Sequence, residues 1–327
     1  MKSFRWGIIG LGRIARKFAE GLQFVPNAQL YAVASRDLTK AQAFAADFQA
    51  THALGSYEAI TQLGDVDAIY IATPHSEHHA NTLMCLKAGI PVLCEKAFAF
   101  NLAQVQEMVG EAQSRKVFLM EALWTRFLPA TIKTLELIEA GEIGEIKHIS
   151  ADFGFLADYN PHGRLFNPSL AGGSLLDIGI YPLLISKFLL GNPTQLSAVA
   201  TLTETGVDMA CSMAAQFANG ATATLFSTLA ARTDTTAVIY GTKGKITLHT
   251  RFHEATALSL QITGQEAQLI PCERMGDGYC YEARHVQECL TQGLTESPVV
   301  PLQFSVELMA IMDDIRKQVG VVYPADN

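Results

Sequence analysis

The sequence lacks the cysteine spacings that mark a metal site or a redox pair. Its six cysteines are scattered and form no Cys-x-x-Cys pair, so we expect neither a zinc knuckle nor a redox dithiol. Reduced and mostly buried thiols are the ordinary interpretation of such a pattern.

An excess of basic residues and a long apolar run near the N-terminus are also missing. The 24 Lys and Arg residues against 32 Asp and Glu residues give a net charge of −8, which argues against a nucleic-acid partner. Gly10, Gly12 and Arg13 interrupt the first apolar stretch before a signal-peptide core or a membrane span could form. We therefore expect a cytoplasmic protein without a membrane partner.

Internal repeats and low-complexity segments are absent too, whereas the length of 327 residues suits two ordinary domains. Hydrophobic residues make up 49% of the chain and charged residues 17%, a balance typical of soluble globular proteins.

The first part of the chain alternates short β-rich apolar runs with helical stretches, which is typical of βαβ units around a parallel sheet. We predict an α/β Rossmann domain over residues 1–122. Its predicted strands are Arg5–Ile9, Leu30–Ser35, Ala68–Ala72, Val92–Cys94 and Val117–Met120. Its predicted helices are Ile14–Phe24, Thr39–Phe48, His78–Ala88 and Leu102–Arg115.

After Met120 the pattern changes, and we predict an α+β domain over residues 123–327 with a large, open, mostly antiparallel sheet. Its predicted strands are Ile146–Phe155, Gln195–Thr203, Asp208–Phe217, Thr222–Leu229, Thr236–Tyr240, Lys245–Thr250 and Ala257–Ile262. Its predicted helices are Pro129–Ala140, Tyr279–Gln292 and Gln303–Val319. That the C-terminal helix packs back on the first domain stays open.

A glycine-rich turn follows the first predicted strand. Gly10, Gly12 and Ala15 form a G-x-G-x-x-A motif, with Arg13 and Ile14 opening the next helix. The first glycine permits the tight turn, the second lets the backbone approach a pyrophosphate, and the helix N-terminus presents N–H groups to the anion. Such turns also occur without a ligand, but the position at the start of a βαβ series favours a dinucleotide.

The end of the second predicted strand bears on which dinucleotide binds. Ser35 and Arg36 offer a hydroxyl and a guanidinium to a 2′-phosphate, which favours NADP. Asp37 keeps NAD open, because a shift of one residue in the strand would place a carboxylate near the ribose.

Two further predicted strands end in polar segments, at the edge of the sheet where ligands bind in α/β folds. Thr73, Pro74 and His75 follow one strand, and Glu95 and Lys96 follow the other, so we assign both segments to the cofactor site. Lys96 would face the nicotinamide, although an exposed loop lysine is an equally ordinary interpretation.

The histidines near position 78 allow two functions. His75 and His78 are spaced to share a helix face, as metal ligands can. No carboxylate or thiolate cluster accompanies them, so we expect no metal and favour a polar contact to the substrate.

The second domain contains Asp177 and Tyr181, four residues apart in a glycine-rich apolar stretch. On a helix they would share one face, where a carboxylate and a phenol could bind a substrate hydroxyl and move its proton. The alternative is a buried helix in which both groups only satisfy local hydrogen bonds.

These stretches together resemble the Gfo/Idh/MocA oxidoreductase family, and within it the branch of dimeric dihydrodiol dehydrogenases and NADP-dependent D-xylose dehydrogenases. The resemblance covers essentially the whole chain. It rests on the residues 10–15, 35–36, 94–96, 118–127 and 172–181.

The resemblance implies that Lys96 and Tyr181 handle the proton and that Asp177 binds the substrate hydroxyl. It implies that Trp124 and His78 line the pocket, with Phe153 and Arg126 at its border. It also implies a homodimer formed by the open faces of two C-terminal sheets.

Two positions depart from the family pattern. Ala97 follows Lys96 where the family usually has proline, which puts the rigidity of the loop in question. Tyr181 stands where many members have histidine, so their substrate ranges transfer poorly.

We expect an NADP(H)-dependent enzyme that transfers hydride between the nicotinamide and a hydroxyl-bearing carbon of a sugar, polyol or cyclic diol. Two alternatives stay open. One is a non-catalytic NAD(P)-sensing protein, because a fold does not imply a function. The other is a keto-sugar reductase, such as an anhydrofructose reductase, that uses the same residues in the opposite direction.

Overall fold

The computed structural model describes residues 3–326, which form two compact units. Unit 1 comprises residues 3–124 and 275–309, and unit 2 comprises residues 125–274 and 310–326. The chain first passes from unit 1 to unit 2 after residue 124, close to the domain boundary that we expected at residue 122. The segment 275–309, which the sequence analysis placed in the second domain, belongs to unit 1.

Unit 1 is built on a parallel sheet with the strand order β3-β2-β1-β4-β5-β6. All residues of β4, β5 and β6 are buried, as expected for a parallel sheet covered on both faces. The strands are β1 (Phe4–Ile9), β2 (Ala28–Ala34), β3 (His52–Leu54), β4 (Ala68–Ile71), β5 (Val92–Glu95) and β6 (Leu119–Ala122).

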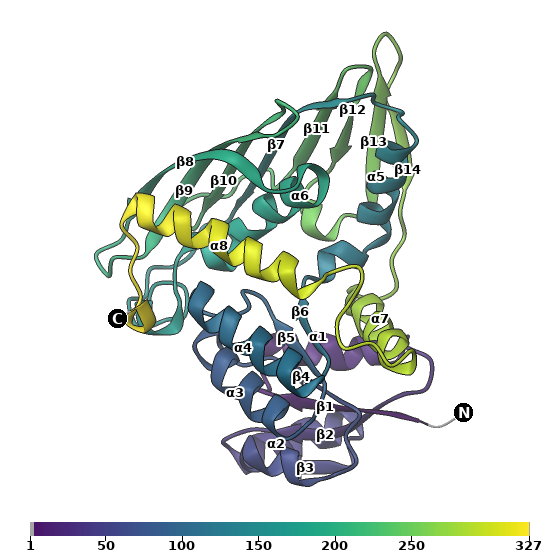
Figure 1. Cartoon of the computed structure of the whole chain (residues 1–327), viewed down its shortest axis with the longest axis vertical. Coiled ribbons are helices and arrows are strands. Elements are labelled where there is room, and N and C mark those ends of the chain that lie inside the picture. Colours follow the sequence, from purple (N-terminus) through teal and green to yellow (C-terminus); the bar gives the residue numbers. More distant parts are fainter. Residues whose placement is uncertain (1–2, 327) are drawn as a thin grey trace. The chain divides into compact units, whose positions relative to one another are not determined.

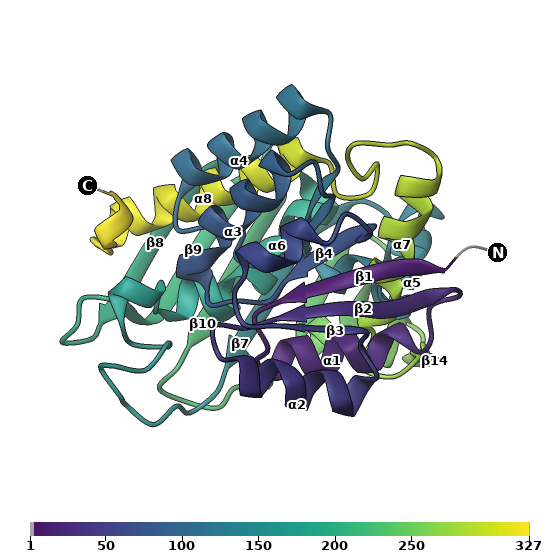
Figure 2. The ribbon, with the colours of Figure 1, turned by 90° about the horizontal axis from the view of Figure 1, so that it is seen from below.

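Helices cover the two faces of this sheet, with α1 and α2 on one face and α3 and α4 on the other (Figure 2). Helix α7 packs on α1, and Gly21 permits this approach because a Cβ there would lie 3.2 Å from the backbone nitrogen of Cys280. This contact explains why the segment 275–309 belongs to unit 1. The helices are α1 (Arg13–Leu22), α2 (Leu38–Phe48), α3 (His75–Lys87), α4 (Leu102–Arg115) and α7 (Tyr279–Thr291).

Unit 2 is built on a mixed sheet with the order β14-β13-β12-β11-β7-β10-β9-β8 (Figure 1). The β7–β10 pair is parallel and the other pairs are antiparallel. The strands are β7 (Ile146–Gly154), β8 (Pro193–Leu202), β9 (Asp208–Phe217), β10 (Thr222–Thr228), β11 (Ala237–Gly241), β12 (Gly244–Leu248), β13 (Ala257–Ile262) and β14 (Gln268–Pro271). The predicted fold class, a Rossmann domain followed by an open, mostly antiparallel sheet, is confirmed.

One face of the second sheet is covered and the other is open within unit 2. Residues alternate along β9, where Cys211 and Met213 are buried and Ser212 and Ala214 are exposed. Helix α6 (Ile180–Leu190) packs on β7 and β10, and α5 (Pro129–Glu139) packs on β13. Helix α8 (Leu302–Val319) begins in unit 1 and ends in unit 2.

The edge strand β8 is partly capped by a side chain of α8. The amide of Gln318 accepts a hydrogen bond from the N–H of Ala198 at 3.0 Å and donates to the carbonyl of Leu196 at 3.2 Å. Because an exposed strand edge can pair with another chain, these bonds protect the sheet against edge-to-edge association.

The most apolar helical stretch, Pro168–Leu190, is long and hydrophobic enough to cross a membrane by length and composition. Its mean hydropathy is 1.5, but 83% of the tested window is buried in the structure. Core helices of water-soluble proteins pass the same test, so this stretch is weak evidence for a membrane span.

Candidate active site

The glycine-rich turn after β1 has the geometry of a pyrophosphate site. Gly10 has φ +85°, and a Cβ there would lie 2.7 Å from the backbone nitrogen of Thr73. A Cβ on Gly12 would meet nothing within 4 Å, so space is open on this side of the backbone. Gly12 caps α1 without a side-chain hydrogen bond, which leaves the N-terminal turn suited to an anion. The residues present therefore fit a dinucleotide.

Of the three residues after β2, Ser35 and Asp37 form local hydrogen bonds and Arg36 is exposed. Asp37 accepts hydrogen bonds from the N–H groups of Thr39 and Lys40 and is therefore the N-cap of α2. Ser35 Oγ accepts one from the N–H of Asp37. Arg36 is 71% exposed, and its guanidinium lies 5.9 Å from the centre of the Tyr57 ring.

A carboxylate lies near this guanidinium. Glu77, in the first turn of α3, has an oxygen 3.9 Å from Arg36 Nη1. Exposed ion pairs at this distance are weak, so Arg36 keeps the freedom to bind a phosphate.

Two histidines of α3 hold the loop that carries Lys96. The Nε2 atom of His75 lies 3.0 Å from the carbonyl oxygen of Lys96, and Nδ1 of His78 lies 2.9 Å from that of Ala97. The other ring nitrogen of His78 lies 2.9 Å from the carbonyl oxygen of Thr73. The histidines therefore join the loop after β5 to the loop after β4. The Lys96–Ala97 peptide bond is cis.

His78 itself is not placed as a pocket-lining residue. It is fully buried, and both ring nitrogens face backbone carbonyls of unit 1. Burial lowers the pKa of His78 to about 4, against the effect of the two carbonyl acceptors, so near pH 7 the ring is neutral and its single N–H donates to one of the two carbonyl oxygens. In the structure His78 contacts the backbone of the Lys96 loop, and the contact to substrate that we expected from the sequence stays a prediction.

Glu95 faces the interior rather than a ligand. Its Oε2 accepts a hydrogen bond from the N–H of Lys96 at 3.2 Å, and its Oε1 accepts one from the hydroxyl of Tyr70. Burial raises the pKa of Glu95, while the charge of Lys96 and these hydrogen bonds lower it. Glu95 therefore supports the backbone at Lys96, and the cofactor contact expected of this segment stays a prediction.

Two more buried carboxyl groups belong to the same region of unit 1. Burial raises the pKa of Glu121 to about 7 and that of Glu282 well above its ordinary value. The charge of Lys96 lowers the pKa of Glu121, and the charge of Glu95 raises that of Glu282. The sequence offered no sign of Glu282, because an acidic residue on an amphipathic helix normally lies in solvent.

Trp124, expected to line the pocket, is a buried aromatic residue of unit 1. Its ring is stacked on Tyr279 at a centroid distance of 4.6 Å and an interplanar angle of 14°. Only 4% of Trp124 and 5% of Tyr279 are exposed. Tyr279, at the start of α7, escaped the sequence analysis because its partner lies far away in the chain.

The second expected site, in unit 2, lies where a π-helical turn (Leu175–Gly179) continues into α6. Asp177 is in the π turn and Tyr181 is the second residue of α6, and both are 8% exposed. Arg164 Nη1 donates a hydrogen bond to Asp177 Oδ1 at 2.9 Å. π turns are rare and often occur at functional sites.

Tyr181 lies in a cluster of three rings. Its centroid is 5.6 Å from that of Phe153 and 4.8 Å from that of His253, and the latter two rings are stacked at 4.4 Å. Phe153 therefore lies beside Tyr181, the expected acid/base. His253 was not predicted, since its 3-10 turn (Phe252–Glu254) has no sequence signature.

Arg126, expected at the border of the site, packs its guanidinium 5.5 Å from the centre of the Phe188 ring. Burial lowers its pKa. Within residues 3–326, no group of three or more His, Cys, Asp or Glu side chains is arranged to hold a metal ion.

The sheet order of unit 1 brings most of the expected cofactor residues together. The turn at Gly10–Ile14, the segment Thr73–His75 and the segment Glu95–Lys96 follow β1, β4 and β5, which are neighbours in the sheet. Because these strands are parallel, their carboxyl ends lie at one edge, as in other dinucleotide-binding sheets. In unit 2, Tyr181 lies beside Phe153, and Asp177 precedes Tyr181 by four residues in the π turn that continues into α6.

Comparisons with known proteins agree with this division. Residues 4–123 match the family described as "Oxidoreductase family, NAD-binding Rossmann fold", and residues 131–247 match the "GFO/IDH/MocA C-terminal domain".

Curated relatives cover the whole chain. A mouse protein named trans-1,2-dihydrobenzene-1,2-diol dehydrogenase is 39% identical over 99% of this chain and 99% of its own length. The human protein of the same name is 38% identical, also over 99% of both chains.

Solved structures show the same fold at lower identity. The aldose-aldose oxidoreductase of Caulobacter crescentus, complexed with glycerol, has a TM-score of 0.90, is 24% identical and covers 98% of both chains. The 3-ketoreductase KijD10 of Actinomadura kijaniata, in complex with NADP and TDP-benzene, has a TM-score of 0.87. It is 24% identical, and the match covers 97% of this chain and 98% of that one.

Both domains of the family match this chain in the same order, and the two relatives are 38% to 39% identical over 99% of the chain. These findings assign the chain to a family. The chain belongs to the Gfo/Idh/MocA family of NAD(P)-binding oxidoreductases and is a dehydrogenase or reductase that acts on CH–OH groups.

Proposed function

We propose that this protein is an NADP(H)-dependent dehydrogenase of vicinal diols, with a cyclic trans-diol as the preferred class and sugars or polyols as the next. The observation that carries the proposal is the pair of fixed segments, one holding Lys96 and the other holding Asp177 and Tyr181. The full-length relatives named as dihydrodiol dehydrogenases support the diol class.

The proposed chemistry divides among three side chains. When bound, the nicotinamide exchanges a hydride at C4 with the carbon that carries the hydroxyl group. Asp177 accepts a hydrogen bond from a substrate hydroxyl, and it also forms an ion pair with Arg164. Tyr181 takes the hydroxyl proton on oxidation and returns it on reduction, and Lys96 is the second residue that we assign to the handling of this proton.

The aromatic residues around Tyr181 suit a substrate with an apolar ring. Phe153 and His253 pack against each other and against Tyr181, so the surroundings of the proposed acid/base are aromatic. This favours a cyclic diol over a small polyol.

The second candidate function is reduction of a keto-sugar by the same residues. The structural likeness to a 3-ketoreductase and an aldose-aldose oxidoreductase is a likeness of fold. The relative rates of oxidation and reduction separate this candidate from the first. A non-catalytic NAD(P) sensor is the third, and it would bind a cofactor that is never oxidised or reduced.

The test of the function is the initial rate of NADP-linked absorbance change with benzene dihydrodiol, trans-1,2-cyclohexanediol, D-xylose and D-glucose. We expect the highest rate with a trans-diol and NADP. Faster reduction of keto-sugars than oxidation of any diol would favour the reductase. Cofactor binding without turnover in either direction would favour the sensor.

Replacing either proton-handling residue should remove most of the activity. Lys96→Met and Tyr181→Phe should each lower kcat by about 100-fold or more, the usual scale of lost acid-base catalysis. NADPH affinity, measured by fluorescence titration, should change little. Turnover near the wild-type value in both variants would remove these residues from the mechanism.

Arg36 should set the preference for NADP over NAD. It is exposed beside Tyr57, while Asp37 is engaged as the cap of α2, so the guanidinium is the group suited to the 2′-phosphate. Arg36→Ala should weaken NADP binding about 10-fold or more and NAD binding little. Arg115→Ala, which removes another partly exposed arginine of unit 1, is the control. Equal weakening of both cofactors by Arg36→Ala would reject the assignment.

We propose further that the open face of the second sheet forms a homodimer. In register on this face lie Val199, Ser212, Ala214 and Thr224, which are small or apolar side chains without charge. Val199 is an apolar side chain that is 71% exposed in the single chain. Exposed apolar side chains that adjoin one another often mark a protein–protein interface.

A charge on this face should therefore break the dimer. Val199→Glu should shift the mass measured by light scattering from dimer to monomer. Leu156→Glu, at an equally exposed position (73%) in the loop after β7, should leave the mass unchanged. A wild-type monomer at micromolar concentration would contradict the proposal.

A cytoplasmic location stays part of the proposal. It is supported by the six free cysteines, which suit a reducing compartment. Cell fractionation with recovery of the protein outside the cytosol would contradict it.

A further inference from the structure

The segment from Gly172 to Tyr181 is held at its start by a carboxylate from another strand. Asp208, the first residue of β9, accepts hydrogen bonds on Oδ2 from the hydroxyl of Ser174 and from the N–H of Leu175, both at 2.7 Å. The first N–H groups of a helix have no partner within the helix, so this carboxylate caps the π turn from outside.

A second strand contributes to the same contact. Ser174 Oγ lies 2.9 Å from Ser227 Oγ of β10. Ser174 and Ser227 are fully buried and Asp208 is 1% exposed. These buried groups bond to one another, with Asp208 bonding through Oδ2, whereas Asp208 Oδ1 is buried without a hydrogen-bond partner among the described residues. The arrangement is therefore costly to disturb.

Two glycines permit this close approach at both ends of the π turn. Gly173 has φ +118°, and a Cβ there would lie 2.2 Å from Asp208 Oδ1. A Cβ on Gly179 would lie 2.9 Å from Ser227 Oγ. Asp177 lies between these two contacts, so its position along the helix depends on both.

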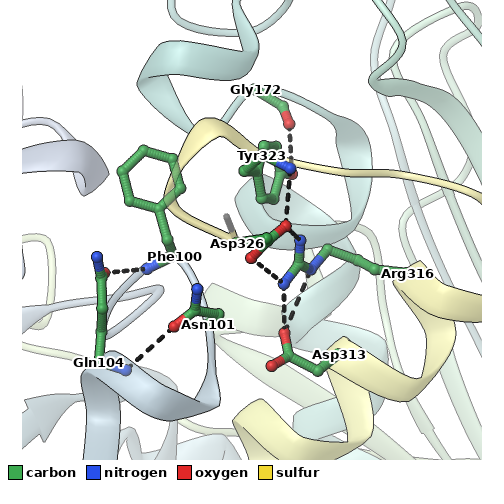
Figure 3. A network of polar contacts seen from close by, with 8 residues as sticks. All are labelled: Phe100, Asn101, Gln104, Gly172, Asp313, Arg316, Tyr323 and Asp326. Carbon is green, nitrogen blue, oxygen red and sulfur yellow. Dashed lines mark hydrogen bonds and ion pairs between the residues drawn. The ribbon is translucent and has the colours of Figure 1, made fainter. Parts of the chain in front are cut away.

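Gly172, three residues before the π turn, is held by the C-terminal segment, as Figure 3 shows. The hydroxyl of Tyr323 donates to the carbonyl of Gly172 at 2.6 Å. Asp326 accepts from the N–H of Tyr323 at 2.7 Å and pairs with Arg316, which also pairs with Asp313. The chain is therefore fixed on both sides of Ser174.

The charge of Asp208 strengthens its hydrogen bonds with Ser174 and Leu175 at neutral to slightly alkaline pH. Burial raises the pKa of Asp208 to about 6, and the hydrogen bonds from Ser174 and Leu175 act in the opposite direction. At pH 8 the group is a carboxylate, so its two hydrogen bonds are charge-assisted and stronger than neutral ones.

We propose that Asp208 is a positioning residue for the reaction: it fixes the π turn and the start of α6 so that Asp177 and Tyr181 meet the substrate in one geometry. This inference rests on the proposed function of those two residues. A displacement of about 1 Å at a reacting group can lower a rate about 100-fold, so a residue without substrate contact can control turnover.

The test compares Asp208→Ala with Asp208→Asn at pH 8, in the full-length protein. Asp208→Ala should lower kcat at least about 10-fold, while the Kd of NADPH stays within about 2-fold. Asp208→Asn should recover much of kcat, because its amide oxygen can accept the same two hydrogen bonds. Asp67→Ala is the matched control, since Asp67 also accepts a backbone N–H, from Arg5, in unit 1.

A second measurement reports on the segment without a substrate. In hydrogen–deuterium exchange, the amides of Leu175 to Tyr181 should exchange faster in Asp208→Ala than in wild type, and those of α4 should not change. A merely global loss of stability would accelerate exchange in both segments. If Asp208→Ala does not fold, Ser174→Ala removes one of the two donors and should lower kcat at least about 3-fold.

The outcomes separate the two proposals. No wild-type turnover on any substrate would overturn the proposed function, and the exchange experiment would still decide the role of Asp208 as an anchor. Wild-type turnover, with unchanged kcat and unchanged exchange in Asp208→Ala or Ser174→Ala, would overturn the positioning role alone.

Discussion

A buried carboxylate accepts a hydrogen bond from the backbone of each segment that carries an expected catalytic residue. In unit 1 the acceptor is Glu95, which binds the N–H of Lys96, and in unit 2 it is Asp208, which binds the N–H of Leu175. Burial raises the pKa of both groups, because a carboxylate that leaves water loses hydration, and the hydrogen bonds that each accepts act in the opposite direction. The rest of each segment is arranged around these two contacts.

In the Lys96 loop, contacts from side chains take the place of a proline that would restrict the backbone. The family pattern usually has proline after this lysine, and Ala97 lacks the ring that fixes the dihedral angle. Here the carbonyl oxygens of Lys96 and Ala97 face ring nitrogens of His75 and His78. Helix α3, which follows the neighbouring strand β4, therefore fixes the loop that the local sequence leaves without a proline.

Secondary structure followed closely from the periodicity of the sequence. The strand Asp208–Phe217 and the helix Leu102–Arg115 have the predicted bounds, because alternation and amphipathic spacing are local signals. The strands missed, His52–Leu54 and Gln268–Pro271, are short and lack fully buried residues. The glycine loop and the Lys96 segment were recognisable for the same reason, since each combines a strand end with a distinctive local motif.

The sequence by itself determined the order of elements, the dinucleotide motif and the candidates Lys96, Asp177 and Tyr181, all of which depend on residues close together in the chain. Only the tertiary structure decided what those candidates contact. Asp208 lies 34 positions from Ser174, and Tyr323 lies 151 positions from Gly172. No local sequence pattern could therefore predict either hydrogen bond. The tertiary structure also showed that His78 is buried against the backbone of the Lys96 loop, because burial and hydrogen-bond partners are set by packing between distant segments.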